Sequence, residues 1–320
     1  MNYDVFNGDA DGIIALLQLR LAFPKQSDLI TGVKRDIALL KQVTALEGDE
    51  ITVLDISMEK NIEALNQNLA TGANVMYVDH HRSGDIPTVD NLDAHIDLDA
   101  NTCTSLIVDA LLKGQYHEWA ITAAFGDNLI AKGNELAKAY GLTAEQSEQL
   151  KELGTLINYN VYGAVVSDLH FHPGALYQDL LQYPSPFSAI ADKASPFYVL
   201  QRAYQQDMQN ALEILPMYNS DKLTLIELPN QAWARRISGV FGNLLANQNP
   251  DSAHGVLTLN KDAIYTLSLR APLNNKQGAG DICSTFATGG GRAAAAGINA
   301  LPKTDIADFI KATEQYYSIN

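Results

Sequence analysis

Three oxygen-bearing side chains alternate along the segment NGDADG, which follows the short apolar run YDVF near the start of the chain. Asn7, Asp9 and Asp11 each offer an oxygen atom, and Gly12 comes directly after them. Carboxylate and amide oxygens are the ligands that hard divalent cations such as Ca²⁺, Mg²⁺ and Mn²⁺ prefer. The spacing therefore indicates a metal-binding loop, and two kinds of loop have to be considered.

A calcium loop of the EF-hand type is the first alternative. Asn7, Asp9, Asp11 and Gly12 match positions 1, 3, 5 and 6 of such a loop, but position 12 is Gln18, which cannot give the bidentate carboxylate required there. The preceding YDVF alternates and is rich in strand-forming residues, where an EF-hand needs a helix. The second alternative is a strand that ends in a loop whose carboxylates hold a catalytic metal.

Further acidic residues stand where other expected strands end. Asp55 closes ITVLD and Asp79 closes VMYVD, and Asp79 is followed at once by His80 and His81. The carboxyl ends of parallel strands meet at one edge of an open sheet, so these side chains are expected beside the NGDADG loop. An Asp at a strand end is more often a helix cap or a turn residue. Four carboxylates and two imidazoles at one edge, however, favour a site for Mn²⁺ or Mg²⁺.

The elements that must position these residues alternate between strand and helix. This βαβαβ pattern predicts an α/β fold with a doubly wound parallel sheet. In the first part of the chain the expected strands and helices cover residues 3–6, 12–22, 49–55, 59–70, 73–79 and 93–98. From about residue 221 a smaller α/β unit is expected, with elements at 223–228, 232–246, 255–259 and 263–270, a glycine run and a final helix.

The domain boundaries follow from a change in composition. Residues 102–182 read as mainly helical, and residues 183–197 carry three prolines, which mark a boundary. We therefore expect a catalytic domain with a helical extension over 1–182, a linker region over 183–220, and a substrate-binding domain over 221–320. The functional cleft is expected between the two domains.

The composition limits the classes of partner. The chain has 320 residues, 47% apolar and 18% charged, which suits two globular domains, and no apolar run approaches the roughly 20 residues of a membrane span. Its start, MNYDVF, does not resemble a signal peptide, and Cys103 and Cys283 lie far apart, so a reducing cytoplasm is expected. The net charge of −15 disfavours long nucleic acid but permits a small phosphate ligand held by metal ions and a few arginines.

Six segments together resemble one protein family. NGDADG, VLDIS, YVDHH and AAFGDN, in this order, resemble the four metal motifs of the DHH phosphoesterase superfamily, which is named for its Asp-His-His triplet. That superfamily includes the exonuclease RecJ, oligoribonucleases, cyclic-dinucleotide phosphodiesterases and manganese pyrophosphatases. TSLIVDALL resembles the helix that follows the triplet, and TGGGRAAAAGI (288–298) resembles the signature of the associated C-terminal substrate-binding domain. The resemblance covers both halves of the chain and favours the catalytic metal loop over the calcium loop.

The resemblance implies a set of ligands for two Mn²⁺ ions, with Mg²⁺ as the other candidate. Asp9 would bind the first ion and Asp11 the second, and Asp55 would bridge both. His80 and Asp127, the latter from AAFGDN, would complete the shell of the second ion. Two ions held about 3.5–4 Å apart activate water for attack on a phosphate group.

Three neighbouring residues have less direct roles in this scheme. His81 would lie in the outer shell or touch the scissile phosphate, and Asp79 would orient the imidazoles. Asn7 departs from the family, in which His or Asp often occupies the corresponding position. Because an amide oxygen is a neutral and weaker ligand, the first ion is expected to bind more weakly than the second.

The glycine run near the C-terminus is expected to contact the substrate. Gly289, Gly290 and Gly291 expose backbone N–H groups that suit a phosphate oxygen, and Arg292 follows them directly. Arg292 stands where the family signature has His, which suggests preference for a charged terminal phosphate. Arg270, at the end of an expected strand, also matches a position that often faces substrate.

The function expected from this resemblance is that of a metal-dependent phosphodiesterase. Its substrate would be a short linear or cyclic dinucleotide, cut to mononucleotides by a metal-activated water. One alternative is a phosphatase acting on a small phosphomonoester or on pyrophosphate. Another, favoured by Asn7, is a nucleotide-binding sensor that has lost catalysis. Neither long nucleic acid nor a membrane is expected as a partner, and the oligomeric state is open, with a homodimer among the possibilities.

Overall fold

The computed structural model describes residues 1–260 and 263–319, and the chain divides into two compact units, Met1–Arg202 and Ala203–Asn320. Each unit is an α/β structure with its own sheet and its own buried core. The first sheet is entirely parallel over the described residues, and the second is mixed. The predicted fold class is therefore confirmed, with a parallel sheet in the N-terminal part and a further α/β unit in the C-terminal part.

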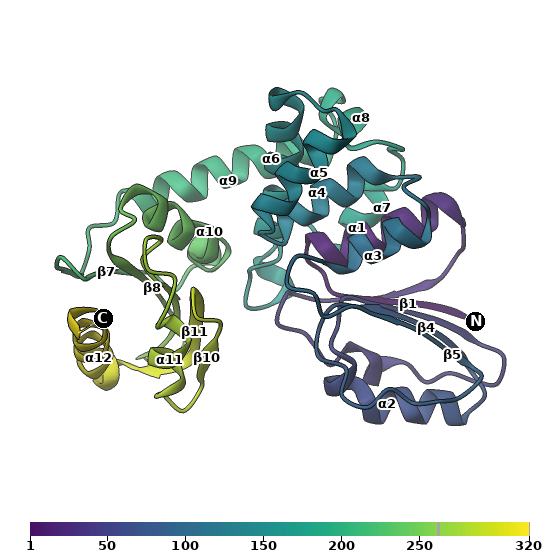
Figure 1. Cartoon of the computed structure of the whole chain (residues 1–320), viewed down its shortest axis with the longest axis horizontal. Coiled ribbons are helices and arrows are strands. Elements are labelled where there is room, and N and C mark those ends of the chain that lie inside the picture. Colours follow the sequence, from purple (N-terminus) through teal and green to yellow (C-terminus); the bar gives the residue numbers. More distant parts are fainter. Residues whose placement is uncertain (261–262, 320) are drawn as a thin grey trace. The chain divides into compact units, whose positions relative to one another are not determined.

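The sheet of the first unit has five strands in the order β2-β1-β3-β4-β5, of which β1, β4 and β5 are labelled in Figure 1. Four of the strands were predicted from their apolar runs, whereas the short edge strand β2 has no such run. The central position of β1 and β3 buries both of their faces, which explains their continuous apolar sequences. In chain order the strands are β1 (Asn2–Phe6), β2 (Asp28–Ile30), β3 (Glu50–Leu54), β4 (Asn74–Asp79) and β5 (Leu92–Ile96).

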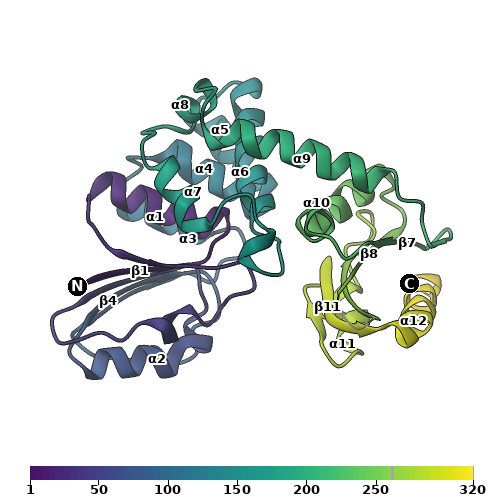
Figure 2. The ribbon, with the colours of Figure 1, turned by 180° about the vertical axis from the view of Figure 1, so that it is seen from behind.

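Helices cover both faces of this sheet (Figure 2). On one face α2 and a short 3₁₀ helix pack against the strands, and on the other face α1 lies between the sheet and α3, α4 and α7. Because α1 is enclosed in this way, its residues from 10 to 20 are all buried. The helices concerned are α1 (Ala10–Ala22), the 3₁₀ helix η1 (Leu39–Gln42), α2 (Met58–Ala70), α3 (Thr104–Leu111), α4 (His117–Gly126) and α7 (Pro173–Leu180).

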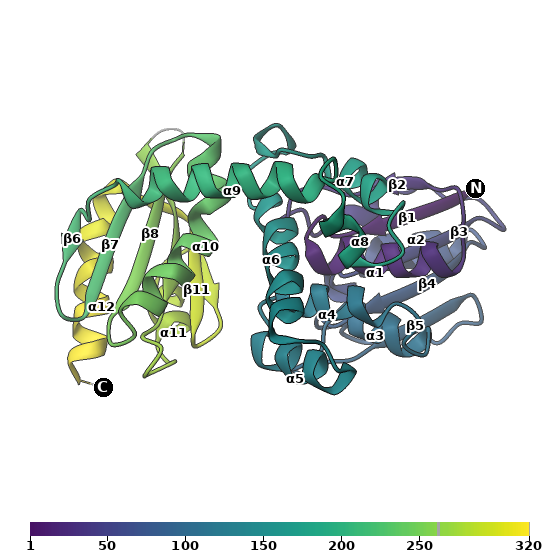
Figure 3. The same ribbon diagram turned by 90° about the horizontal axis from the view of Figure 1, so that it is seen from above.

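The helical extension of the first unit centres on α4, which packs against α1, α5 and α6 (Figure 3). The region predicted as a linker, 183–220, contains two further helices. Pro186 and Pro196 stand at the first positions of these helices, where proline is tolerated because the missing N–H would have no helical partner. The remaining helical elements here are α5 (Ile130–Tyr140), α6 (Ala144–Asn160), η2 (Val166–Asp168), α8 (Pro186–Ala191) and α9 (Pro196–Leu212).

The second unit has a mixed sheet in the order β10-β11-β9-β8-β7-β6, and among its described strands only β7 and β8 pair in parallel. Helix α10 packs on one face, and α11 and α12 pack on the other (Figure 1). The strands are β6 (Tyr218–Asn219), β7 (Leu223–Leu228), β8 (Ala253–Leu259), β9 (Ile264–Arg270), β10 (Gly289–Gly291) and β11 (Ala295–Pro302). The helices are α10 (Ala232–Gln248), α11 (Ala279–Ser284), the 3₁₀ helix η4 (Lys303–Asp305) and α12 (Ile306–Ile319).

The glycine run forms the edge strand β10 rather than an irregular loop. Gly290 pairs with Gly297 of β11, and Gly291 pairs with Ala296. A Cβ atom at Gly289 would lie 1.8 Å from the carbonyl oxygen of Cys283, so no larger residue fits there. The glycines therefore allow the edge of the sheet to pack directly against α11.

Within residues 1–260 and 263–319, no helix combines the length and the apolar character that crossing a membrane would require.

Candidate metal centre

The first part of the candidate site is the turn from β1 into α1. Asp9 caps α1, and its Oδ1 accepts the N–H groups of Asp11 and Gly12, both at 3.1 Å. A Cβ at Gly8 would lie 2.0 Å from the carbonyl oxygen of Gly32, so glycine lets the chain around residue 32 approach this turn closely. Asp9 thus caps a helix, as a strand-end Asp often does, and also lies in the candidate site.

Asp55 follows β3 directly and lies at the centre of the cluster. Its side chain is 2% exposed, and its backbone has a φ of 59°, in the left-handed region. The N–H of Asp55 donates to the carbonyl oxygen of Val78, 3.1 Å away, which ties the end of β3 to β4. The hydroxyl of Thr104 donates to Asp55 Oδ1 at 3.2 Å. These contacts fix the carboxylate between the ends of two strands.

The Asp-His-His triplet places both imidazoles against Asp55. His80 Nε2 lies 3.4 Å from Asp55 Oδ1 and 3.8 Å from Asp11 Oδ2. His81 Nδ1 lies 3.8 Å from Asp55 Oδ1 and 2.8 Å from Asp79 Oδ1. Ligand atoms about 2.1 Å from one ion are at most about 4.2 Å apart. The distances from Asp55 Oδ1 to His80 Nε2 and to His81 Nδ1 fall within this limit, and the three ligand atoms all lie within 4.8 Å of one another.

Asp11 is held by the N-terminus of α3. The backbone N–H groups of Thr104 and Ser105 donate to its two carboxylate oxygens, each at 2.7 Å, and the Ser105 hydroxyl donates to the Asp11 carbonyl oxygen at 2.8 Å. The N–H groups at a helix N-terminus are good donors to a carboxylate, so these contacts keep Asp11 in place. The Thr-Ser pair in the sequence indicates the start of a helix, but it does not show that Asp11 is the residue bound there.

Asp127 joins the same acidic group from the C-terminal end of α4. Burial raises the pKa of its carboxyl to about 6, and the charges of Asp11 and Asp9 act in the same direction, whereas Lys34 and His80 oppose the rise. Burial also raises the pKa of Asp55 well above its ordinary value, with the charges of Asp9 and Asp11 adding to the effect. Crowded carboxylates with raised pKa values are held together at a free-energy cost that a bound cation would remove.

A buried oxygen without a partner gives a second indication that the cluster suits a cation. Asp79 is fully buried, and while its Oδ1 contacts His81, its Oδ2 makes no hydrogen bond within the described part of the chain. Oxygen and imidazole donors in this combination suit Mn²⁺ or Mg²⁺. The residues present therefore fit one divalent ion near Asp55, His80 and His81.

Lys34 is a member of the site that the sequence did not reveal. Its Nζ lies 2.6 Å from Asp9 Oδ2 and 3.3 Å from Asn158 Oδ1. Burial would raise the pKa of Asp9, but the Lys34 ammonium and its hydrogen bonds lower it to about 2. Burial would lower the pKa of Lys34, but the charge of Asp9 raises it well above its ordinary value. Nothing in the segment TGVKRD distinguishes this lysine from a solvated one.

The residues expected to contact phosphate lie in the second unit, at one end of neighbouring strands. Ala295 of β11 pairs with Arg270 and accepts the N–H of Arg292, so both arginines belong to the same end of this sheet. Arg292 is exposed. The Arg270 guanidinium donates to Asn243 Oδ1 at 2.6 Å and to Ser268 Oγ at 2.8 Å, which ties β9 to α10.

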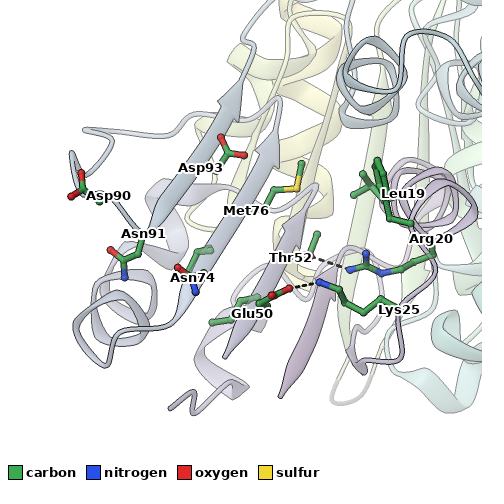
Figure 4. A pocket seen from close by; sticks show the side chains of 13 residues that line it. Leu19, Arg20, Lys25, Glu50, Thr52, Asn74, Met76, Asp90, Asn91 and Asp93 are labelled. Atoms are coloured by element: carbon green, nitrogen blue, oxygen red, sulfur yellow. Dashed lines mark hydrogen bonds and ion pairs between the residues drawn. The ribbon is translucent and has the colours of Figure 1, made fainter. Parts of the chain in front are cut away.

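A pocket of about 390 Å³ lies at the end of the first sheet that is opposite the candidate metal centre (Figure 4). Arg20 and Lys25 line it, and each is paired: Arg20 Nε donates to Asp4 Oδ2 at 2.9 Å, and Lys25 contacts the carboxylate of Glu50. This pocket contains none of the residues predicted to bind metal. The candidate metal centre lies instead at the carboxyl ends of the strands, as expected for an open parallel sheet.

Comparisons with solved structures identify the class of fold. The chain resembles RecJ from Thermus thermophilus in complex with Mn²⁺, with a TM-score of 0.65 and 17% identity, over 100% of this chain and 52% of that one. It thus spans about half the length of that RecJ. It also resembles a second structure, of exonuclease RecJ bound to manganese, with a TM-score of 0.61 and 16% identity, over 99% and 90% of the two chains.

A third structure agrees with this chain in length as well as in fold. It is a pGpG-specific phosphodiesterase, PggH from Vibrio cholerae, with a TM-score of 0.58 and 14% identity, over 100% of this chain and 99% of that one. These likenesses confirm the predicted resemblance to the DHH phosphoesterases at the level of fold. No protein-family model matches the sequence, and no curated protein sequence matches it.

Proposed function

We propose that this protein is a metal-dependent phosphodiesterase that hydrolyses short linear or cyclic dinucleotides to mononucleotides. One observation carries the proposal: Asp55, His80 and His81 converge at the carboxyl ends of parallel strands, among buried carboxylates that a cation would stabilise. The fold is shared with a phosphodiesterase of similar length and with two manganese-bound RecJ structures. The proposal of phosphate chemistry depends more on this group of carboxylates and imidazoles than on the fold.

Of the two ions that the resemblance implies, the second has Asp55, His80, Asp11 and Asp127 as its proposed ligands. Bound there, Mn²⁺ or Mg²⁺ supplies Lewis-acid polarisation of the phosphate and acidification of a water molecule. Asp55 is kept in position by the Thr104 hydroxyl, and Asp11 is kept in position by backbone N–H groups of α3. These fixed contacts mean that the carboxylates do not have to rearrange when the ion binds.

His81 is proposed to touch the scissile phosphate. Its side chain is 43% exposed, whereas that of His80 is 9% exposed, so His81 is the imidazole that a substrate can reach. Asp79 Oδ1, 2.8 Å from His81 Nδ1, orients the ring. Burial would lower the pKa of His81, but the hydrogen bond and charge of Asp79 raise it, which favours the imidazolium that attracts a phosphate oxygen.

The second unit is proposed to bind a further phosphate group of the substrate. Gly289, Gly290 and Gly291 lie in the edge strand β10, and the exposed Arg292 follows them. A guanidinium binds a phosphate through two parallel hydrogen bonds, so Arg292 is proposed as the main contact. Arg270, whose guanidinium already donates to Asn243 and Ser268, is proposed to support the same strand ends.

The size of the substrate is proposed from the charge of the chain. A net charge of −15 repels every additional phosphate of a long strand, whereas a basic protein would gain affinity there by releasing counterions. A dinucleotide carries few phosphates, so it meets little of this repulsion. The proposed substrate is therefore short.

A panel of substrates with purified protein and Mn²⁺ tests this proposal. We expect rapid hydrolysis of a linear dinucleotide bearing a 5′-phosphate or of a cyclic dinucleotide, and slow hydrolysis of a twenty-nucleotide strand. Exclusive release of phosphate from mononucleotides or pyrophosphate would replace the proposal with a phosphatase. Binding of dinucleotides without turnover of any phosphoester would replace it with a sensor. Equal rates on the long strand and the dinucleotide would move the protein to the exonuclease class.

A variant of the second unit tests whether that unit binds the substrate. Replacement Arg292→Ala should raise KM for the 5′-phosphorylated dinucleotide about tenfold, the loss expected for a charged hydrogen bond of about 1.4 kcal/mol. Hydrolysis of a small chromogenic phosphodiester, which does not carry the second phosphate, should be unchanged. The matched control is the exposed Lys303→Ala in the same unit. Equal effects of Arg292→Ala on both substrates would remove Arg292 from substrate recognition.

A further inference from the structure

The place that the family resemblance gives to the first metal ion is surrounded by polar atoms that already have partners. Asn7 Oδ1 accepts the N–H of Asp9 at 3.2 Å, and Asn7 Nδ2 donates to the carbonyl oxygen of Lys34 at 3.3 Å. Asp9 Oδ1 accepts two backbone N–H groups, and Asp9 Oδ2 accepts the Lys34 ammonium at 2.6 Å. Asn7 and Asp9, which the resemblance implies as ligands of the first ion beside the bridging Asp55, therefore hold a turn and a lysine.

Lys34 is held in this position from several sides. Its backbone N–H donates to the carbonyl oxygen of Val161 at 3.3 Å, and its own carbonyl oxygen accepts the Asn7 amide. Its ammonium also contacts Asn158 Oδ1 at 3.3 Å and lies 5.6 Å from the centre of the Tyr162 ring. An ammonium fixed by main-chain and side-chain contacts is part of the architecture of the site, in contrast to a mobile surface lysine.

We propose that Lys34 supplies the positive charge at Asp9, in the place of one of the two metal ions, so that this chain binds a single divalent ion. The inference rests on the proposed function, because it concerns the same site. The remaining ion has Asp55, His80, Asp11 and Asp127 as its ligands. The neutral Asn7 agrees with this assignment: where a lysine provides the charge, an anionic or imidazole ligand at position 7 has no ion to bind.

The number of ions bound per chain tests the proposal without reference to activity. Metal-free protein is dialysed against Mn²⁺ and its manganese content is measured, and electron paramagnetic resonance then distinguishes isolated Mn²⁺ from a magnetically coupled pair. Wild-type protein and Lys34→Arg should bind one ion and give the spectrum of isolated Mn²⁺. The double variant Asn7→Asp/Lys34→Met, which removes the ammonium and adds a carboxylate, should bind two ions and give the coupled spectrum.

Two control variants complete the set. Asn7→Asp alone should still bind one ion, because Lys34 remains in place. Lys60→Met removes an exposed lysine from α2 and should behave like the wild type. Thermal unfolding of each metal-free variant confirms that it is folded before the ions are counted.

Two results would overturn the inference. Two ions in the wild-type protein would show that Lys34 does not occupy the place of an ion, even if the double variant failed to fold. A single ion in the folded double variant would show the same. Failure of the proposed function looks different, because the substrate panel would then show another substrate preference or no turnover, whatever number of ions is counted. Failure of this inference alone leaves the hydrolysis of dinucleotides intact with two ions bound.

Discussion

The two ends of the parallel sheet in the first unit carry charge in opposite ways. At the carboxyl ends, Asp11, Asp55 and Asp127 are crowded, and the pKa values of Asp55 and Asp127 are raised by burial and by their neighbours. At the other end, Arg20 pairs with Asp4, with contacts on both carboxylate oxygens (Figure 4 shows Arg20). The same strand, β1, and the same helix, α1, contribute to both ends.

At one end the charges are balanced within the chain, and at the other end like charges are crowded together, where a bound cation would balance them. Asp4 is 1% exposed, and besides Arg20 it accepts the Ser27 hydroxyl at 2.7 Å, so its charge is balanced within the chain. Removing one member of such a pair leaves a buried charge alone and costs stability. Removing one member of a crowded like-charged group relieves repulsion and costs function instead. Substitutions at the two ends should therefore affect different measurements.

The largest expected effect is on catalysis at the carboxyl ends. Replacement Asp55→Asn should lower kcat/KM for a dinucleotide by about 10⁴-fold, or about 5 kcal/mol, because a neutral amide is a poor ligand for the proposed ion. The thermal unfolding temperature of the metal-free variant should be equal to or above that of the wild type, since one crowded charge is gone. A rate loss below about tenfold would exclude Asp55 from the centre of the site.

The next effect is on stability at the opposite end. Replacement Arg20→Met should lower the free energy of unfolding by about 3–5 kcal/mol, measured in urea, because the Asp4 carboxylate stays buried without its cation. The double variant Asp4→Leu/Arg20→Met serves as the control and should recover most of the loss. Activity of the folded Arg20→Met protein at low temperature should match the wild type. If the variant were as stable as the wild type, the two ends would not differ in the way described.

A third prediction concerns stabilisation by the ion itself. Mn²⁺ at about one hundred times its Kd should stabilise the wild-type protein by about 2.7 kcal/mol relative to a solution with chelator. His80→Gln, which removes an imidazole ligand, should lose most of this gain, whereas the Arg20→Met variant should keep it. Differential scanning fluorimetry with and without Mn²⁺ measures both. Equal stabilisation of wild type and His80→Gln would place the ion elsewhere.

The smallest effect is expected from the exposed pair at the pocket rim, Lys25 and Glu50. An exposed ion pair contributes about 0.5 kcal/mol, so Lys25→Met should reduce stability by this small amount at neutral pH. The hydrogen bond and charge of Lys25 lower the pKa of Glu50 from its ordinary value of 4.5. When the pKa of a carboxyl is lower in the folded protein than in the unfolded chain, the group stabilises the fold at any pH above its unfolded pKa. This stabilisation is lost as the pH falls through its folded pKa.

Urea unfolding as a function of pH tests this pair. The difference between wild type and Lys25→Met should be present at pH 7, should begin to shrink near pH 4.5, the ordinary pKa of Glu50, and should disappear once the pH is below the lowered pKa of the folded protein. It should also shrink in high salt, because the pair is exposed. A difference that persisted unchanged in acid would mean that Lys25 acts through packing of its alkyl chain.

The fold was predictable because its signals are local. Apolar runs that end in Asp marked β3 and β4, a similar run before NGDADG marked β1, and the alternation with helices implied that their carboxyl ends would meet. Asp55, Asp79, His80 and His81 could be placed together for this reason. The short strand β2 and the glycine strand β10 lacked the apolar run that identifies a strand, and they form only because a neighbouring strand is available for pairing.

What the sequence could not show depends on distant segments. Lys34 reaches Asp9 only because Gly8 lets the chain around Gly32 pass close by, and no local pattern records that approach. In the same way, the sequence does not show that the Arg270 guanidinium donates to Asn243 of α10, because that contact is set by the packing of helix on sheet. The partners of long side chains depend on the tertiary structure and cannot be identified from local sequence.

The backbone at residue 55 has a consequence for how this site could vary. A φ of 59° is accessible to glycine and tolerated by Asn and Asp, but it is strained for β-branched and most other residues. A library of all amino acids at position 55, sorted for folding alone, should therefore retain mainly Asp, Asn and Gly. The same library sorted for hydrolysis should retain only Asp. A single conservative exchange at this position should thus remove the proposed chemistry while the surrounding architecture is kept.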